Sequence, residues 1–224
     1  MGRTDTAAQV ETLVVSAFEP EIAPLRRLLR GAPGVAMAAV GIGAVEAAAG
    51  AARAIAALRP RRVLFVGTAG VYARGRAAPA LDSAAVADEL VLVSTAALRG
   101  DGYLPEPTIV RAATARLLRD ALARAAGSKP VAVACPLAIT RSPALARRIA
   151  AATGATLENL EVFAVARAAA ATGVDFGAVL GIANRVGPMA HAEWRAHHRA
   201  ASGEACRLIA GLLKPPHFTK NPPV

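Results

Sequence analysis

The chain has 224 residues, of which 54% are hydrophobic, 4% aromatic and 19% charged, and its formal net charge is +10. This composition favours a sizeable aliphatic core and excludes wholesale disorder, and no run approaches the roughly 18 apolar residues that span a bilayer. The basic residues are scattered rather than gathered with aromatic residues in one stripe, so we expect no nucleic-acid partner, no membrane attachment and a cytoplasmic location.

Apolar runs rich in β-branched residues alternate with stretches of helical periodicity along the chain. In chain order we expect strand 12–18, helix 21–30, strand 35–40, helix 44–59, strand 61–67, loop 68–85, strand 86–95, loop 97–107, helix 108–126, strand 129–136, helix 142–153, strand 154–159, helix 160–173, strand 175–184 and helix 191–213. Thr108 and Ser142 are the expected N-caps of their helices, and Gly173 is the expected stop of another.

This alternation predicts an α/β protein with a three-layer α-β-α sandwich around a central, mixed and mostly parallel sheet. We assign residues 1–214 to a single domain and residues 215–224 to a Pro-rich, flexible C-terminal tail. Sheets of this kind bind ligands beyond the carboxyl ends of their strands. The candidate functional residues therefore lie at the strand-to-loop junctions, which are 18–21, 41–43, 67–70, 139–141, 158–161 and 183–184.

Taken singly, most of these junctions allow two interpretations. The GIG stretch at 41–43 could hold an anion with its N–H groups or form a tight turn, and Glu46 removes any match to G-x-G-x-x-G. Thr68 could donate to a substrate oxygen or serve as a cap. Glu21 could act chemically or simply favour the start of a helix.

Two carboxylates, Glu158 and Glu161, stand at the start of an otherwise apolar run. Burying such groups costs free energy unless something pairs with them. A carboxylate accepts hydrogen bonds, so it can hold both hydroxyls of a ribose, and its charge favours the positive character that develops when a glycosidic bond stretches. The alternative is that Glu158 pairs with an arginine and Glu161 points to solvent.

The segments AFEPEI, VGIGAVEAA, VGTAGVY, TLENLEVFA and GAVLGIANRVGP occur at successive strand ends. In this order they resemble the purine nucleoside phosphorylase/nucleosidase superfamily over almost the full chain. The segments LENLE and GIANRVGPMAHAEW are most similar to those of futalosine hydrolases. The resemblance implies cleavage of futalosine, an inosine-like nucleoside of the alternative menaquinone route, with release of hypoxanthine.

The resemblance also implies roles for individual residues. Glu161 would hold the ribose hydroxyls, Glu21 would orient or deprotonate the attacking water, and Asn184 would face N7 and the six-position of the purine. The residues that would bind substrate are Gly43, Thr68, Ala69, Gly70, Ala138, Ile139, Glu158 and Leu160. The resemblance implies no cofactor and no metal, and it suggests a homo-oligomer.

Two details bear on the reaction. A glutamate rather than an arginine occupies the first junction, which favours water over phosphate as the nucleophile, although Arg26 and Arg27 follow one turn later. Asn184 offers an N–H donor that an ionised aspartate lacks, and this favours a 6-oxopurine. The alternatives are a methylthioadenosine/S-adenosylhomocysteine-type nucleosidase, a purine nucleoside phosphorylase, or a nucleoside-binding protein with weak catalysis.

Several positions depart from the pattern of the relatives. Leu180 replaces an arginine, Val162 and Phe163 replace small residues, Ala183 replaces a serine, and the stretch from Met189 to His191 replaces charged residues. These changes bear on the substrate and on activity itself, and Phe163 could fill the cavity. We interpret His191, His197 and His198 as surface or interface residues and Trp194 as a packing anchor.

Overall fold

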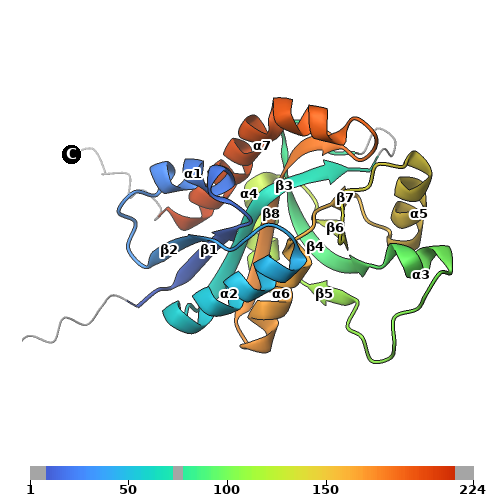
Figure 1. Ribbon diagram of the computed structural model, residues 1–224. Helices are drawn as coiled ribbons and strands as arrows, with labels where there is room; N and C mark the ends of the chain where they lie inside the picture. The colour runs from blue at the N-terminus through green and yellow to red at the C-terminus, as the bar shows by residue number, and fades with distance from the viewer. Residues whose placement is uncertain (1–8, 73–77, 215–224) are drawn as a thin grey trace, which may run out of the picture.

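The computed structural model describes residues 9–72 and 78–214, so the expected tail at 215–224 lies outside the described residues. Eight strands form one sheet with helices on both faces (Figure 1). The strands are β1 (Thr12–Ser16), β2 (Val35–Ala39), β3 (Arg62–Val71), β4 (Ala84–Val93), β5 (Arg111–Ala113), β6 (Val131–Pro136), β7 (Leu157–Glu158) and β8 (Asp175–Arg185). The helices are α1 (Glu19–Leu28), α2 (Ala44–Leu58), α3 (Thr95–Arg99), α4 (Arg116–Ala126), α5 (Pro143–Thr153), α6 (Val162–Ala171) and α7 (Ala190–Leu213).

The sheet is mixed and mostly parallel, as predicted. Its order is β2-β1-β3-β7-β6-β4-β5, and β8 pairs with both β3 and β4. The antiparallel pairs are β3–β7, β4–β5 and β4–β8. Because β3, β8, β4, β6 and β7 pair in a circuit that returns to β3, this end of the sheet curls on itself and gathers several strand ends.

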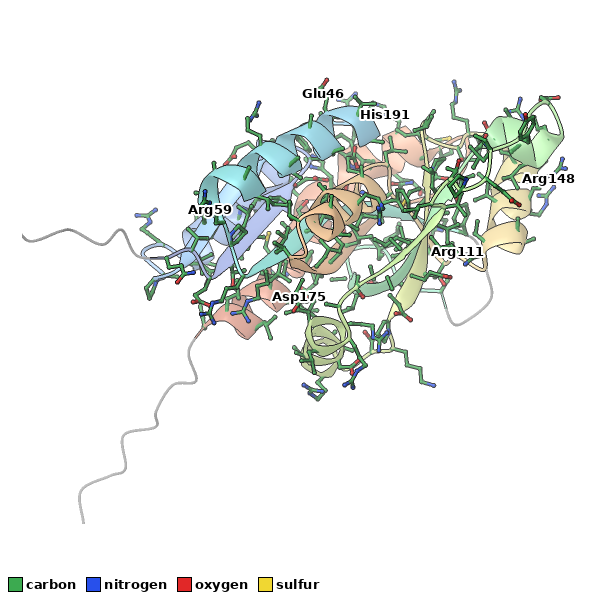
Figure 2. The ribbon with its side chains drawn as sticks, turned by 90° about the horizontal axis from the view of Figure 1, so that it is seen from below. Glu46, Arg59, Arg111, Arg148, Asp175 and His191 are labelled. Atoms are coloured by element: carbon green, nitrogen blue, oxygen red, sulfur yellow. The ribbon has the colours of Figure 1, made fainter. Side chains whose placement is uncertain are left out.

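Helices α1, α4 and α7 cover one face of the sheet, and α2 and α6 pack together on the other (Figure 1). Each layer buries the aliphatic side chains of its helices, such as Ile22 and Leu25 of α1 against Val14 of β1. The charged residues labelled in Figure 2 (Glu46, Arg59, Arg111, Arg148 and Asp175) lie on the outside of these layers. The structure thus confirms the expected α-β-α sandwich.

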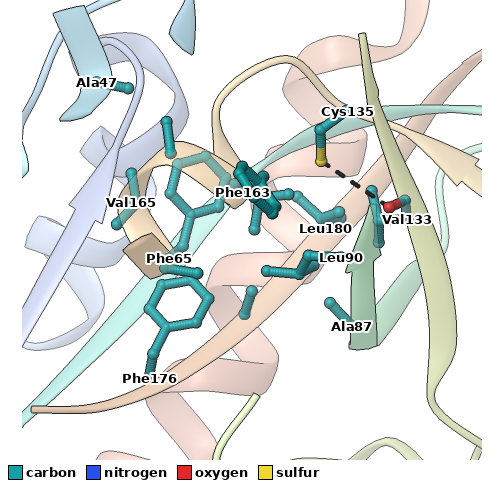
Figure 3. Close-up of a cluster of buried hydrophobic side chains, with 14 of the residues drawn as sticks. Ala47, Phe65, Ala87, Leu90, Val133, Cys135, Phe163, Val165, Phe176 and Leu180 are labelled. Atoms are coloured by element: carbon teal, nitrogen blue, oxygen red, sulfur yellow. Dashed lines mark hydrogen bonds between the residues drawn. The ribbon is translucent and has the colours of Figure 1, made fainter. Parts of the chain in front are cut away.

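Two of the unusual residues belong to the core. Phe163 and Leu180 lie in a buried cluster between the sheet and the α2–α6 layer, together with Phe65 and Phe176 (Figure 3). Leu180 is completely buried there, so the position at which relatives carry an arginine is apolar packing in this chain. Phe163 packs into the core and does not fill the cavity described below.

The expected helix 108–126 is wrong in its first half. Arg111–Ala113 forms β5, which pairs with Glu89–Val91, and α4 begins at Arg116. Thr108 does not cap a helix, because its hydroxyl donates to the carbonyl of Pro105. The segment pairs with the exposed edge of β4, a long-range contact that overrides the local helical periodicity.

Two expected loops contain regular structure. β3 continues through Thr68 to Val71, and β4 starts at Ala84, while residues 73–77 lie outside the described part of the chain. Residues 95–99 form α3, whose N-cap Ser94 accepts a hydrogen bond from the Ala97 N–H at 3.2 Å. Ser142 caps α5 as predicted, and Gly173 follows α6 with a φ of +68°.

Gly50 allows α2 to lie directly on the end of β2. A Cβ atom at this position would lie 2.0 Å from the Val40 carbonyl oxygen, whereas a Cβ on Gly203 of α7 would make only an ordinary contact at 3.7 Å. We expect Gly50→Ala to lower the free energy of unfolding by about 1–3 kcal/mol or more through overpacking. Gly203→Ala should be neutral or stabilising by up to about 1 kcal/mol, because alanine favours helix. Urea titration of both variants checks this, and equal effects would contradict it.

Candidate active site

A cavity of about 330 Å³ lies where the C-terminal ends of β1, β3, β7 and β8 meet the start of α7. The register explains the convergence, because Gly70 of β3 pairs with Asn184 of β8 on one side and with Glu158 of β7 on the other. The cavity is lined by Ala17, Phe18, Glu21, Ile42, Thr68, Ala69, Gly70, Ile139, Glu158, Asn159, Leu160, Glu161, Asn184, Ala190, His191 and Trp194.

Glu21 is held in the first turn of α1 by three hydrogen bonds. Its Oε1 accepts from the Thr68 hydroxyl at 2.6 Å and from the Thr68 N–H at 3.0 Å, and its Oε2 accepts from the Ser16 hydroxyl at 2.9 Å. Burial raises the pKa of Glu21 to about 7, and the Glu161 charge adds to the rise while the hydrogen bonds oppose it. The carboxyl can therefore gain and lose a proton near neutral pH.

Glu161 stands immediately before α6 and is only 6% exposed, so the interpretation that it points to solvent is wrong. Its Oε1 accepts from the Gly43 N–H at 2.9 Å. Gly43 has a φ of +85°, which side chains other than glycine rarely adopt, and it precedes α2. Burial raises the pKa of Glu161, while the Gly43 N–H opposes this rise.

Glu158 is also buried, and each of its carboxylate oxygens accepts one hydrogen bond from within the fold. The Tyr72 hydroxyl donates to its Oε2 at 2.7 Å, and the Thr140 N–H donates to its Oε1 at 2.9 Å. The alternative that Glu158 pairs with an arginine does not hold among the described residues, since its partners there are a phenol and an amide. These bonds give Glu158 a fixed place in the wall of the cavity.

Asn159 was not singled out from the sequence, yet it connects three parts of the site. Its Nδ2 donates to the Thr68 carbonyl at 2.9 Å, and its Oδ1 accepts from the N–H groups of Glu161 at 2.9 Å and Val162 at 2.8 Å. Asparagine is typical of helix starts, and this was the available signal. Asn159 thus holds Glu161 and the end of β3 at a fixed separation.

The predicted binding residues do not all line the cavity. Thr68, Ala69, Gly70, Ile139, Glu158 and Leu160 do, whereas Gly43 and the exposed Ala138 lie outside the lining. The resemblance assigned both Ala138 and Ile139, which follow β6, to the base, and the structure places only Ile139 in the lining.

Asn184 lies in the wall beside Gly70, where an added Cβ would come within 2.8 Å of its Nδ2. The absence of a side chain at Gly70 therefore gives Asn184 its space. In this structure the Nδ2 donates to the carbonyl of the neighbouring Arg185 at 3.0 Å.

The start of α7 supplies two residues that the sequence assigned to the surface or to packing. His191 lines the cavity, although it is exposed on its outer side. Trp194 packs against Phe18 and His198, as a packing anchor would, but it also lines the cavity and its Nε1 donates to the Thr68 hydroxyl at 3.1 Å. His197 faces elsewhere and pairs with Asp82 at 2.9 Å.

The described residues contain no group of three or more His, Cys, Asp and Glu side chains suited to a metal ion. Within the same residues, no helix is both long enough and apolar enough to cross a membrane.

Residues 12–214 match the sequence model of the phosphorylase superfamily. Futalosine hydrolase of Streptomyces coelicolor is 34% identical over 185 residues, which cover 79% of this chain and 78% of that protein.

Solved structures share the fold at low sequence identity. Futalosine hydrolase of Helicobacter pylori superimposes with a TM-score of 0.80 at 19% identity, covering 91% of this chain and 97% of that one. The 5′-methylthioadenosine/S-adenosylhomocysteine nucleosidase of Neisseria meningitidis, solved with methylthio-immucillin-A, gives a TM-score of 0.80 at 19% identity, covering 92% and 99%.

The buried Glu21 has a consequence for stability. Because its pKa is about 7 rather than the ordinary 4.5, the folded state keeps a proton between these pH values that the unfolded state has released. This contribution to stability is present at low pH and is lost as pH rises through about 7. Glutamine retains the Oε1 acceptor and can donate to Ser16, so Glu21→Gln should raise the free energy of unfolding at pH 8 by up to about 3 kcal/mol.

Denaturant titrations between pH 5 and 8.5 check this expectation. Glu19→Gln is the matched control, since Glu19 is exposed and pairs only with Arg26, and such surface pairs contribute little. A Glu21→Gln protein whose stability falls with pH as steeply as that of the unmodified chain would contradict the expectation.

Proposed function

The chain belongs to the phosphorylase superfamily, and we propose that it is an N-ribosyl hydrolase that cleaves the glycosidic bond of a purine nucleoside, futalosine by preference. The observation that carries this proposal is the pair of buried carboxylates, Glu21 and Glu161, at one cavity. Neither pairs with a basic side chain among the residues that the structure describes, and their pKa values are raised, which is typical of catalytic carboxylates.

The two carboxylates have different roles in this proposal. Glu161 accepts the ribose hydroxyls and stabilises the positive charge that develops on the ribose as the bond between C1′ and the purine nitrogen breaks. The electron pair of that bond passes to the base, which lies near Asn184. The oxygen of a water molecule bonds to C1′, and Glu21 takes a proton from that water.

Water is favoured over phosphate as the nucleophile by the charges around the cavity. Among the described residues that line it, none is lysine or arginine, and three are glutamates. A phosphate dianion would meet these carboxylates without a compensating cation, which is unfavourable in a buried site. Arg26, which the sequence left as a possible phosphate ligand, instead pairs with Glu19.

The identity of the nucleoside rests on two observations. The curated relative at 34% identity is a futalosine hydrolase. Asn184 carries an amide N–H that can donate to the O6 or N7 acceptors of hypoxanthine, whereas an aspartate could accept from the amino group of adenine. We further propose that the protein acts in menaquinone biosynthesis, in the cytoplasm, and as a homo-oligomer, as the futalosine hydrolase resemblance suggests.

Incubation with futalosine, inosine and 5′-methylthioadenosine, each with and without inorganic phosphate, tests the proposal by chromatography of the released base. We expect release of hypoxanthine from futalosine, free ribose product rather than ribose 1-phosphate, and no dependence on phosphate. Glu161→Gln and Glu21→Gln should each lower kcat by about 100- to 10,000-fold, the range for loss of a catalytic proton carrier or charge stabiliser.

Three results would contradict this. Phosphate dependence would identify a phosphorylase, preferred cleavage of methylthioadenosine would identify the other nucleosidase class, and calorimetric binding of a purine without turnover of any nucleoside would identify a binding protein. Glu19→Gln is again the control with unchanged activity, because Glu19 is exposed and lies outside the cavity lining.

The role of Asn184 gives a specificity prediction. In Asn184→Asp the donor to a 6-oxopurine is replaced by an acceptor, and a buried polar group left without its partner costs about 1–3 kcal/mol. We expect kcat/KM for futalosine to fall by about 10- to 100-fold relative to that for methylthioadenosine, since 1.4 kcal/mol corresponds to a factor of ten. Equal losses for both substrates would contradict a role for Asn184 in reading the base.

A further inference from the structure

We propose that Trp194 is a positioning residue, which acts through the Thr68 hydroxyl to keep Glu21 a hydrogen-bonded carboxylate and to leave only Oε2 of Glu21 free to take a proton. The proposal rests on the proposed role of Glu21 as the base that activates water. It concerns a residue of the last helix whose packing alone would not suggest a part in proton transfer.

The direction of the hydrogen bonds follows from the chemistry of the groups. An indole N–H can only donate, so the 3.1 Å bond from Trp194 Nε1 makes the Thr68 hydroxyl oxygen an acceptor. The single hydroxyl proton of Thr68 is then directed to Glu21 Oε1, which lies 2.6 Å away. Trp194 thereby occupies one of the two acceptor sites of the Thr68 oxygen, which leaves the hydroxyl less able to accept a hydrogen bond from a neutral Glu21 and favours its donation to the carboxylate.

The same network distinguishes the two oxygens of Glu21. Oε1 receives two hydrogen bonds, from the N–H and the hydroxyl of Thr68. Oε2 receives one, from Ser16. Since each carboxylate oxygen has about two acceptor sites, Oε1 is filled and Oε2 has a site left. Oε2 is therefore the atom that can accept the proton of a water molecule.

The indole is held in place by rings on either side. His198 stacks on Trp194 with ring centroids 4.5 Å apart, and His191 and Phe18 lie at 6.0 and 6.3 Å. The helix that carries Trp194 is fixed to the helix that carries Glu21, because the Cys206 thiol of α7 donates to the Glu21 carbonyl at 3.3 Å. The packing of α7 against α1 thus holds Trp194 within hydrogen-bonding distance of Thr68.

Other titratable groups surround Glu21 and Trp194. Glu161 and the buried Cys206 are electrostatically coupled to Glu21, Glu158 lies in the same cavity wall, and His191 and His198 flank the indole. Any pH effect assigned to the bond between Trp194 and Thr68 must be separated from the titration of these groups. Variants that remove the indole N–H but keep an aromatic ring are therefore required.

The test is the pH dependence of kcat/KM for futalosine in Trp194→Phe, which keeps a ring in the stack but loses the N–H. Without the bond from Trp194, both acceptor sites of the Thr68 oxygen are open to a hydrogen bond from a protonated Glu21, so the acidic limb should move to higher pH. We expect a shift of about half to one pH unit, which makes the loss about three- to tenfold at pH 6 and under about twofold at pH 9.

Three further proteins make the test specific. Thr68→Val removes the hydroxyl, and adding Trp194→Phe to it should cause no further shift of the acidic limb. His197→Gln changes the same helix at a residue paired with Asp82, away from the cavity lining, and should leave the profile unchanged. A uniform loss at all pH values in Trp194→Phe, or an equal shift with and without the Thr68 hydroxyl, would overturn the proposal.

A second measurement needs no substrate. Trp194 is the single tryptophan of the chain, so fluorescence excited near 295 nm reports on this site alone. We expect a pH transition with a midpoint near the Glu21 pKa of about 7 that disappears in Glu21→Gln and persists in His198→Gln and His191→Gln. A transition that survives in Glu21→Gln would overturn the proposal.

The two measurements distinguish failure of the proposed function from failure of the link between Trp194 and Glu21. If no nucleoside is hydrolysed but the Glu21-dependent transition is present, the proposed function fails and the link between Trp194 and Glu21 stands. If futalosine is hydrolysed and Trp194→Phe leaves the acidic limb in place, the function stands and the link fails. Circular dichroism and the thermal midpoint of each variant establish that it is folded before either comparison is made.

Discussion

Two carboxylates that have no cationic partner among the described residues lie in the wall of one cavity, and the surrounding structure stabilises them with hydrogen-bond donors. Glu21 and Glu161 are 5% and 6% exposed, and their charges are met by backbone N–H groups and hydroxyls rather than by arginine or lysine. Such donors lower the cost of burial only in part, which leaves both pKa values raised. A carboxylate held in this way stays available to positive charge on a ligand, because no cation among the described residues competes for it.

Thr68 is the residue that connects the buried carboxylate of Glu21 to the hydrogen bonds of the surrounding elements. Its N–H and hydroxyl both donate to Glu21, its carbonyl accepts from Asn159, and its hydroxyl oxygen accepts from Trp194. One residue of β3 thereby links α1, the start of α6 and the start of α7. The position of β3 in the sheet, paired with β1, β7 and β8, brings these elements within hydrogen-bonding distance of the same side chain.

Much of the fold and part of the site follow from local sequence. The alternation of apolar runs and amphipathic stretches predicts the layers, and the rule that ligands lie beyond strand ends places Glu21, Thr68, Glu161 and Asn184 together before any coordinates. Sequence reasoning failed where long-range contacts decide the outcome. The register of β5 on β4 overrode a helical pattern, and the choice of Tyr72 rather than an arginine as the partner of Glu158 depends on a contact between residues 86 positions apart.

Asn159 and Trp194 show why the network itself could not be predicted. Each has an ordinary local interpretation, a helix start and an apolar anchor, and each fulfils it. What distinguishes them is a second bond to Thr68, which is 91 positions from Asn159 and 126 from Trp194. Both bonds end on Thr68, which also bonds Glu21, and Asn159 also bonds the N–H of Glu161. The packing around Asn159 and Trp194 therefore holds both carboxylates in place.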